Sequence, residues 1–371
     1  MTLHAVTVPK WGLAMEEGQI VHWYVAPGAR VSTGDALVDI ETPKITNTLE
    51  AEGPGTIRRI LGAEGETLPC GQVIAVLDDG ESGEPDVDDF VKNAILSLEA
   101  KHPEETTGKT LRPALVDVGS GSLNYLAMGA PTDLSIILIH GFGGDLNNWM
   151  FNQPVLAAAG RTISFDLPGH GGSTKTVGNG SIDELALRIS VALKSLQLER
   201  FHLVGHSLGG AVASKVAASV PGSCASLTLI SSAGLGEEIN GDYLEAFVVA
   251  KRRRELQKVL ESLFADPSLV TSDMAEEILR AKRLDGAEAA LRQVLAANFA
   301  DSRQLFGLRE QIIHLDIPIM TIWGESDLII PATHSNGLPG STQVLAETGH
   351  MAHIEKAAEV NTLIAKHIAA A

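Results

Sequence analysis

Ser207, Asp327 and His350 are side chains of the types that together perform nucleophilic acyl transfer. Ser207 stands at the centre of residues 205–209, GHSLG, which follow an apolar run and precede small residues with helical spacing. This pattern predicts a strand, a sharp turn and a helix, and such a turn pushes the central serine outward from the sheet. We expect Ser207 to be a nucleophile. The alternative is a turn of this shape that only supports the fold.

Asp327 and His350 each follow a later apolar run, in the segments WGESD and ETGH. A serine hydroxyl is a weak nucleophile until a base takes its proton, and an imidazole base needs a carboxylate that orients it and stabilises its charged form. We therefore predict that His350 is the base and that Asp327 orients it. Glu325 competes with Asp327 for this role, and His353 is predicted to be structural.

Residues 140–144, HGFGG, follow another apolar run and are suited to an oxyanion hole. Acyl transfer develops negative charge on the carbonyl oxygen, and backbone N–H groups can stabilise that charge. The predicted donors are the backbone N–H groups of Phe142 and of Leu208, which starts the helix after Ser207. His140 is predicted to shape the loop and not to act as the base.

Lys44 offers a second kind of chemistry, because it lies at the tip of a predicted hairpin. Alternating apolar residues at 36–40 and 45–51 predict the two strands of that hairpin. Residues 28–37 and 65–74 repeat the same glycine and apolar positions, which predicts two small sheets related by a pseudo-two-fold axis. Lys44 is thus either a covalent attachment site or an ordinary solvated turn lysine.

The elements that must position Ser207 and its partners begin at about residue 113. Apolar runs alternate there with stretches of helical spacing, which predicts a mostly parallel sheet covered by helices on both faces. The segment 235–313 is mostly helical in pattern and is predicted to be a cap that shapes the substrate pocket. The predicted strands are 135–139, 162–165, 201–204, 226–230, 318–323 and 343–345, after a hairpin of 114–118 and 123–128, with helices at about 183–197 and 208–219.

Composition divides the chain into predicted domains at 1–79 and 113–371. The segment 80–112 between them begins as an acidic stretch rich in Gly, Ser and Pro, which predicts a flexible linker. This linker contains one predicted helix, at about 86–102, whose apolar residues share one face. That helix either packs on the second domain or docks a partner subunit.

The chain has 371 residues and a net charge of −18, so nucleic acid is not an expected partner. The two cysteines, Cys70 and Cys224, have no neighbours at metal-ligand spacing, which predicts free thiols, no metal site and a reducing compartment. The sequence has no signal-peptide pattern and no apolar run long enough to cross a bilayer. We therefore expect a cytoplasmic protein that does not contact a membrane.

Residues 4–79 resemble a lipoyl domain of the biotinyl and lipoyl attachment type. This resemblance implies that Lys44 carries lipoic acid as an amide. A biotin domain would have methionine on both sides of the lysine, whereas Pro43 and Ile45 flank it here. Pro43 stands where the family usually has aspartate, a difference that bears on recognition by the attaching enzyme. The resemblance rests on residues 8–10, 15–18, 41–44, 49–51 and 55.

Residues 113–371 resemble the α/β-hydrolase family throughout. The chain order Ser207, Asp327, His350 is that of the family's catalytic residues. Residues 166–171, DLPGHG, also match the family, as a structural turn. The expected fold class is therefore multidomain, with an all-β lipoyl domain of the flattened barrel or sandwich kind followed by an α/β-hydrolase domain with a helical cap.

A lipoyl domain joined to an α/β-hydrolase domain resembles the acyltransferase components of acetoin dehydrogenase complexes. The pyruvate-type acyltransferases carry a His-x-x-x-Asp-Gly signature, which this sequence lacks. The resemblance implies transfer of an acetyl group from lipoyl-Lys44 to coenzyme A in acetoin catabolism. It also implies thiamine-diphosphate-dependent acetoin dehydrogenase subunits and a flavoprotein dihydrolipoyl dehydrogenase as partners, together with a homo-oligomeric core.

The sequence leaves two other functions open. One is a serine ester or thioester hydrolase with an attached lipoyl-like module, and the other is a scaffold whose lipoyl domain only shuttles. For a transferase, either Ser207 carries the acetyl group or His350 activates the coenzyme A thiol for direct transfer. The basic run 251–254, KRRR, is either a solvated helix face or a contact for the phosphates of coenzyme A.

Overall fold

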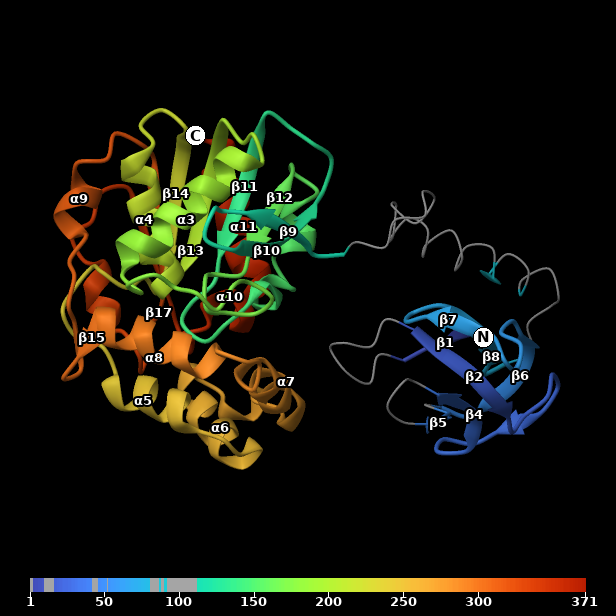
Figure 1. Ribbon diagram of the computed structural model, residues 1–371. Coiled ribbons are helices and arrows are strands. Elements are labelled where there is room, and N and C mark those ends of the chain that lie inside the picture. The colour runs from blue at the N-terminus through green and yellow to red at the C-terminus, as the bar shows by residue number, and fades with distance from the viewer. Residues whose placement is uncertain are drawn as a thin grey trace. The chain divides into compact units, whose positions relative to one another are not determined.

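The computed structural model describes residues 3–9, 17–41, 46–51, 53–80, 87, 90–91 and 112–371. The chain divides into two compact units, Met1–Thr110 and Leu111–Ala371, which are described separately below (Figure 1). Lys44 and Pro43 lie outside the described residues, as does most of the predicted linker 80–112. Of the predicted helix 86–102, Val87, Phe90 and Val91 are described, and all three are helical.

The first unit consists of two four-stranded antiparallel sheets. Ile20, Leu37, Ile57 and Ile74 are fully or almost fully buried and belong to one apolar cluster shared by the two sheets. One sheet has the order β1-β8-β6-β3 and the other β5-β4-β2-β7. Their bounds are β1 (Leu3–Thr7), β2 (Glu17–Trp23), β3 (Arg30–Val31), β4 (Ala36–Glu41), β5 (Thr46–Glu50), β6 (Gly55–Ile60), β7 (Thr67–Pro69) and β8 (Val73–Asp78).

The backbone of the first unit repeats as the sequence predicts. Gly28 and Gly65 are matched positions of the two copies, with φ angles of 90° and 87°. Gly34 and Gly71 form the next matched pair, with 88° and 87°. Because such angles strain residues that have a Cβ atom, glycine is required at both turns of each copy.

The predicted hairpin on either side of Lys44 is confirmed by the pairing of β4 with β5. The register places Glu41 opposite Thr46, so the segment 42–45 connects the two paired strands. This segment, including Lys44, is outside the described residues.

The second unit is built on an eight-stranded sheet of order β18-β17-β14-β13-β11-β12-β10-β9. Strands β9 and β10 form an antiparallel edge and the remaining strands run parallel, as the alternating pattern predicts. The bounds are β9 (Ala114–Asp117), β10 (Ser122–Met128), β11 (Leu134–Ile139), β12 (Thr162–Phe165), β13 (Arg200–His206), β14 (Cys224–Ile230), β17 (Ile319–Gly324) and β18 (Ser341–Leu345).

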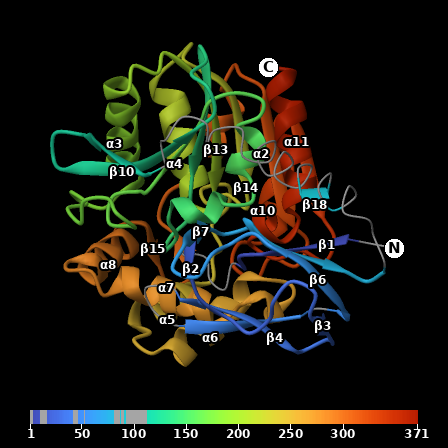
Figure 2. The same ribbon diagram turned by 90° about the vertical axis from the view of Figure 1, so that its right-hand side faces the viewer.

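Helices cover both faces of this sheet (Figure 2). Helices α3 (Ile182–Ser195) and α4 (Leu208–Ser219) pack on one face through a large apolar cluster, and α11 (Ala357–Ala369) and α2 (Gln153–Leu156) pack on the other through a second cluster. Helix α3 begins where the Ser181 side chain accepts a hydrogen bond from the N–H of Glu184, an N-cap that satisfies one terminal donor. Because both faces are covered, the parallel strands inside the sheet are almost wholly buried, whereas the edge strand β18 is mostly exposed.

Of the five α-helices that the described residues form between β14 and β17, the first four cover one end of the sheet (Figure 1). They fall within the segment 235–313 that the sequence predicts to be mostly helical. A two-strand hairpin of β15 (Phe299–Ala300) and β16 (Arg303–Gln304) follows them and was not predicted. The helices are α5 (Gly241–Val249), α6 (Arg253–Leu260), α7 (Ser272–Lys282) and α8 (Ala287–Asn298).

Two further helices and four short 3-10 elements complete the described part of the second unit, and two of these short elements are η2 (Leu146–Trp149) and η4 (Pro267–Leu269). Helix α10 (Ala352–Glu355) precedes α11, and α9 (Arg309–Ile313) precedes β17. The element η3 (Glu261–Leu263) follows α6 directly, and η5 (Ala332–Ser335) follows β17. No helix among the residues described is long and apolar enough to span a membrane.

Replacing Ile137 by Ala should lower the free energy of unfolding by about 2–5 kcal/mol, because the buried side chain at the centre of β11 leaves a cavity. Val344→Ala in β18 is the matched control, since Val344 is 50% exposed, and it should cost less than about 0.5 kcal/mol. Urea unfolding of the full chain, followed by circular dichroism, measures both. Equal losses for the two variants would contradict this account of the core.

Candidate active site

Ser207 occupies a strained turn between β13 and α4, as predicted. Its backbone has φ 53° and ψ −120°, a conformation that residues with a side chain rarely adopt. A Cβ atom on Gly205 would lie 2.4 Å from the Gly209 carbonyl oxygen, and one on Gly209 would lie 2.2 Å from the Ile139 carbonyl oxygen. Glycine at both positions therefore allows strand, helix and neighbouring strand to meet directly under Ser207.

The predicted oxyanion loop, residues 140–144, lies against Ser207. A Cβ atom on Gly141 would be 3.0 Å from the Ser207 Cβ atom and 2.9 Å from Nδ1 of His206. Within the described part of the chain, the backbone N–H groups of Phe142 and Leu208 donate no hydrogen bond, and Leu208 begins helix α4. Both N–H groups are thus available to an acceptor, and the helix N-terminus at Leu208 favours negative charge.

The Asp327 and His350 side chains form a buried pair. His350 Nδ1 lies 2.8 Å from Asp327 Oδ2, with side-chain exposures of 3% and 0%. Asp327 Oδ1 accepts hydrogen bonds from the N–H groups of Ile329 at 2.8 Å and Ile330 at 3.0 Å. Glu325, the competing carboxylate, is exposed.

Two opposing effects act on the Asp327 carboxylate. Burial alone would raise its pKa, but the charge and hydrogen bond of His350, together with the Ile330 and Ile329 N–H groups, lower the pKa below its ordinary value. Asp327 is therefore ionised at neutral pH. An ionised carboxylate on Nδ1 leaves Nε2 of His350 as the nitrogen that can accept a proton.

Two hydrogen bonds hold the His350 backbone. The His350 N–H donates to the Leu263 carbonyl oxygen at 2.8 Å, and His206 Nε2 lies 3.0 Å from the His350 carbonyl oxygen. Because a carbonyl can only accept, His206 carries its proton on Nε2. His206 therefore joins the turn at Ser207 to the segment that carries His350.

The structure brings Ser207, His206 and His350 into one buried site. The His206 and His350 ring centroids are 4.8 Å apart. Among the residues described, Ser207 Oγ and His350 Nε2 form no hydrogen bond; such bonds commonly tighten only when substrate is bound.

His140 and His353 are both structural in their contacts, as expected. His140 Nδ1 lies 2.7 Å from the Gly141 carbonyl oxygen, and its Nε2 accepts the Leu167 N–H at 3.0 Å, so the ring fixes the oxyanion loop. His353 is fully buried between the rings of Trp149 and His206, with centroid distances of 4.7 and 4.5 Å. Burial and the neighbouring His350 lower the pKa of His353 to about 3, so it is neutral.

The predicted structural turn at residues 166–171 is confirmed. The Asp166 carboxylate accepts the N–H groups of Leu146 at 2.7 Å and Gly172 at 2.6 Å and the Asn124 side-chain amide at 2.8 Å. These bonds fasten the turn to the segment that follows the oxyanion loop.

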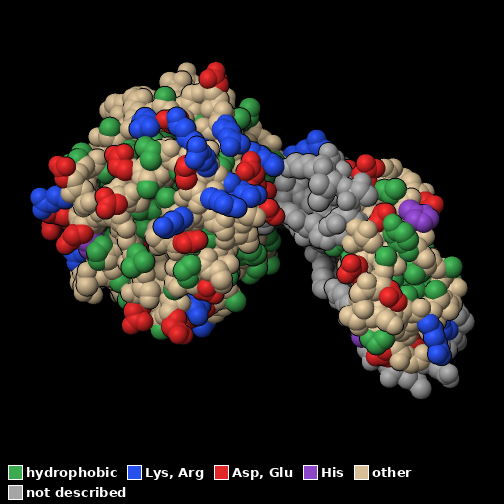
Figure 3. Space-filling view, turned by 90° about the horizontal axis from the view of Figure 1, so that it is seen from below, with side chains coloured by type: hydrophobic (Ala, Val, Ile, Leu, Met, Phe, Trp, Pro, Cys, Tyr) green, Lys and Arg blue, Asp and Glu red, His purple; other side chains and the backbone are tan. Residues whose placement is uncertain are grey.

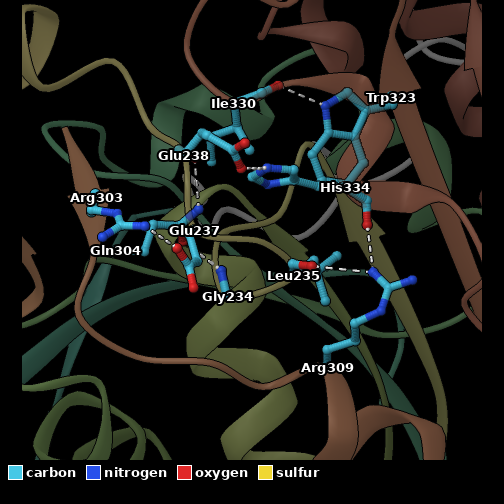
Figure 4. A network of polar contacts seen from close by, with 10 residues as sticks. All are labelled: Gly234, Leu235, Glu237, Glu238, Arg303, Gln304, Arg309, Trp323, Ile330 and His334. Atoms are coloured by element: carbon cyan, nitrogen blue, oxygen red, sulfur yellow. Dashed lines mark hydrogen bonds and ion pairs between the residues drawn. The ribbon is translucent and has the colours of Figure 1, made fainter.

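A polar network that the sequence analysis missed braces the Asp327 loop (Figure 4). The Trp323 indole N–H donates to the Ile330 carbonyl oxygen at 3.0 Å. The N–H of the same residue, Ile330, donates to the Asp327 carboxylate. Nε2 of the buried His334 lies 2.8 Å from Glu238, and Arg309 donates to the carbonyl oxygens of Leu235 and His334, 3.1 Å each. The network therefore ties the segment after β14 to the segment after β17.

The geometry is that of the α/β-hydrolase class, with Ser207 at a strained strand-to-helix turn and a buried Asp327–His350 pair, and a separate two-sheet unit precedes it. The chain matches the family model for the α/β hydrolase fold over residues 135–357 and the model described as biotin-requiring enzyme over residues 4–77. Among solved structures it resembles a meta-cleavage product hydrolase, at 23% identity and a TM-score of 0.63 over 70% of this chain and 98% of that one. It also resembles a serine hydrolase of carbazole degradation, at 20% identity and a TM-score of 0.62 over 71% of this chain and 100% of that one.

Two relatives share both parts of the chain. The chain is 42% identical to the dihydrolipoyllysine-residue acetyltransferase component of the acetoin cleaving system of Pseudomonas putida, over 97% of this chain and 96% of that protein. It is 36% identical to the component of the same name from Cupriavidus necator, over 99% of this chain and 98% of that protein. The chain belongs to this family of dihydrolipoyllysine-residue acetyltransferase components.

Gly141→Ala should slow acyl transfer at Ser207 by about a hundredfold, because the added Cβ displaces the oxyanion loop. Gly307→Ala is the matched control, since a Cβ atom at Gly307 meets nothing within 4 Å. Release of nitrophenol from a short-chain acyl ester measures the rate, and the melting temperature checks that both variants fold. An unimpaired Gly141→Ala variant would show that this loop does not stabilise the transition state.

His353→Phe should change the pH dependence of stability while the fold is kept. Below about pH 6.5 an unfolded histidine binds a proton that the buried, neutral His353 does not, so the free energy of unfolding falls by up to about 1.4 kcal/mol per pH unit until about pH 3. The variant lacks this loss and should gain stability relative to the parent as the pH falls. If the free energy of unfolding of the parent and of the variant changed equally with pH, His353 would not be a neutral residue in the folded chain.

Proposed function

We propose that the chain transfers an acetyl group from a lipoyl group on Lys44 to coenzyme A, as the acyltransferase component of an acetoin dehydrogenase-type complex in acetoin catabolism. The buried Asp327–His350 pair beside the strained Ser207 carries the proposal, because this arrangement is suited to acyl transfer. The printed names of the two full-length relatives support it.

The described strands around Lys44 fit a lipoyl attachment site. Strands β4 and β5 pair up to Glu41 and Thr46, which leaves a short connection with Lys44 in it. When bound there, a lipoyl group would supply an acetyl thioester on a long arm. The proposal assigns Lys44 as its attachment residue, with Pro43 beside it as a determinant for the attaching enzyme.

Ser207, Asp327 and His350 are the proposed catalytic residues. The Ser207 oxygen bonds to the acetyl carbon while His350 takes the hydroxyl proton, and the carbon–sulfur bond breaks as His350 returns that proton to the leaving thiol. The coenzyme A thiol then gives its proton to His350 as its sulfur bonds to the acetyl carbon. The bond between that carbon and the Ser207 oxygen breaks as His350 returns the proton to Ser207. The N–H groups of Phe142 and Leu208 are proposed to stabilise each oxyanion.

Direct transfer is the alternative route to the same product. In that route His350 takes the proton of the coenzyme A thiol, whose sulfur bonds to the acetyl carbon without a bond to Ser207. The bond from that carbon to the lipoyl sulfur breaks, and His350 returns the proton to the leaving sulfur. The two routes differ in whether Ser207 is acetylated.

The proposed domain organisation places the swinging lipoyl domain at 1–79, a linker at 80–112 and the catalytic domain at 113–371, with a cap at about 235–313. Because the linker tethers the two domains, the encounter of the acetylated lipoyl group with the catalytic domain is intramolecular. The effective concentration of the acetyl donor then rises to roughly the millimolar range. The linker is proposed to matter for turnover for that reason.

The proposed partners follow from the same cycle. Thiamine-diphosphate-dependent acetoin dehydrogenase subunits would deliver the acetyl group, and dihydrolipoyl dehydrogenase would reoxidise the lipoyl group. A homo-oligomeric core and a cytoplasmic location complete the proposal. Cys224 is a free cysteine, which fits a reducing compartment.

The test is acetyl-coenzyme A formation by the lipoylated chain. Ser207→Ala should lower the rate by at least about a thousandfold, Lys44→Ala should abolish turnover through the complex, and the exposed control Ser268→Ala should not change either. Full transferase activity in Ser207→Ala would rule out the acetyl-enzyme route, and full activity in His350→Ala would rule out both routes. Hydrolysis of short acyl esters with no coenzyme A dependence would instead favour a hydrolase.

A further inference from the structure

Helix α6 carries a concentration of positive charge in an acidic chain. The net charge of the chain is −18, yet residues 251–258 hold five basic side chains and one acidic one. The face of the second unit that bears the cap helices shows a group of Lys and Arg side chains (Figure 3). We call the five basic residues of this segment the α6 basic face: Lys251, Arg252, Arg253, Arg254 and Lys258.

The charges of the α6 basic face are exposed and poorly compensated. The Lys251 and Arg252 side chains are 74% and 84% exposed, and each reaches an acidic partner only at 3.7 Å. In the described part of the chain, Arg253, Arg254 and Lys258 form no ion pair. Exposed pairs of this kind contribute little to stability, so the fold does not need these charges.

Leu256 and Leu260 of helix α6 are buried, whereas all five residues of the α6 basic face are exposed. The helix N-terminus, at Arg253, adds partial positive charge. The Glu255 carboxylate accepts the N–H groups of Lys251 at 3.4 Å and Arg252 at 3.3 Å there and offsets part of this charge. Because five basic side chains face this one carboxylate, the segment favours a multiply charged anion.

The other end of the same segment touches the active site. Element η3 follows α6, and its Leu263 carbonyl oxygen accepts the N–H groups of His350 at 2.8 Å and Met351 at 3.2 Å. At the rise of helical backbone, Arg253 and Leu263 are about 15 Å apart. The segment 253–263 thus runs from the basic face to the proposed base.

A groove follows this segment. It has a volume of about 370 Å³ and lies between α5 and α6, lined by Tyr243, Ala246, Lys258, Val259 and Ser262 together with polar residues that include Asp242 and Glu255. Lys258 belongs to the α6 basic face, and Ser262 belongs to η3. The lining of the groove therefore includes one residue of the α6 basic face and the residue that precedes Leu263.

We propose that the α6 basic face binds the phosphates of coenzyme A and that the groove beside α6 receives its pantetheine arm. The inference rests on the proposed acetyl transfer to coenzyme A. The arm is a chain of about a dozen bonds, which spans about 15 Å when extended and so matches the length of the segment 253–263. Phosphates at Arg253 and Arg254 would place the thiol at the His350 end, where it must lose its proton.

The experiment measures acceptor kinetics with the full chain and acetyl-dihydrolipoamide as donor. The acceptors are coenzyme A and pantetheine, which carries the same thiol without the phosphates. The test variant is Arg253→Glu with Arg254→Glu. The matched control is Lys194→Glu with Lys366→Glu, two exposed residues of α3 and α11 that are remote from α6 in sequence and lie on other helices.

The KM of the test variant for coenzyme A should rise by about 10- to 100-fold. Each substitution removes a charge-assisted contact with phosphate and puts a negative charge in its place. The KM of this variant for pantetheine and its kcat should stay within about twofold of the parent, as should its hydrolysis of a short acyl ester. The control variant should keep all these values. Added salt should raise the KM for coenzyme A in the parent and have much less effect in the test variant.

An unchanged KM for coenzyme A in the test variant, with normal acetyl-coenzyme A formation, would overturn the phosphate site and leave the proposed function intact. An equal rise in the KM for pantetheine would also overturn it, because the effect would then not depend on phosphate. A parent chain that forms no acetyl-coenzyme A would overturn the proposed function itself. A loss confined to turnover through the complex, with free donor unaffected, would assign the face to an acidic protein domain instead.

Discussion

The close approach of strand β13 and helix α4 is the constraint on which the active site depends. Backbone atoms meet at Gly205 and Gly209, where a Cβ atom would lie 2.4 Å or less from a carbonyl oxygen. At the turn between them, Ser207 has a φ angle of 53°. Such a backbone conformation destabilises the folded chain by about 1–3 kcal/mol. The buried sheet and helix on either side hold the turn in place, so the strain is offset by packing elsewhere.

Burial decides how the site can be used. Ser207 is 7% exposed and His350 is 3% exposed, so little bulk water reaches either group. An acyl group held there would persist until an acceptor enters with its own binding contacts, which is what transfer to a thiol requires in place of hydrolysis. The fold of a hydrolase is thus compatible with a transferase when access is restricted.

Local chemistry made much of the structure predictable. The turn at Ser207 and the paired glycines Gly28 and Gly65 depend on residues that neighbour each other in the chain, and each was found where the pattern placed it. The hairpin of β15 and β16 was missed because two-residue strands show no alternation. The bond from His206 to the His350 carbonyl joins residues 144 apart in sequence, and only the tertiary fold brings them together.

The network around Arg309 and His334 escaped prediction for a related reason. Its acceptors are mostly backbone carbonyl oxygens, which every residue possesses and which leave no mark in a sequence. Asp327 was identifiable from its place after a strand, but the Trp323 and Ile330 contacts that brace its loop were not. Catalytic side chains are visible in a sequence more readily than the groups that hold them still.

The Leu263 carbonyl oxygen has a mechanical consequence. It accepts the N–H groups of both His350 and Met351, so the segment that leaves α6 shares backbone hydrogen bonds with the segment that carries His350. Movement of α6 and η3 away from the sheet would therefore have to break two backbone hydrogen bonds next to the imidazole. The position of this part of the helical segment and the position of His350 are coupled through one carbonyl oxygen.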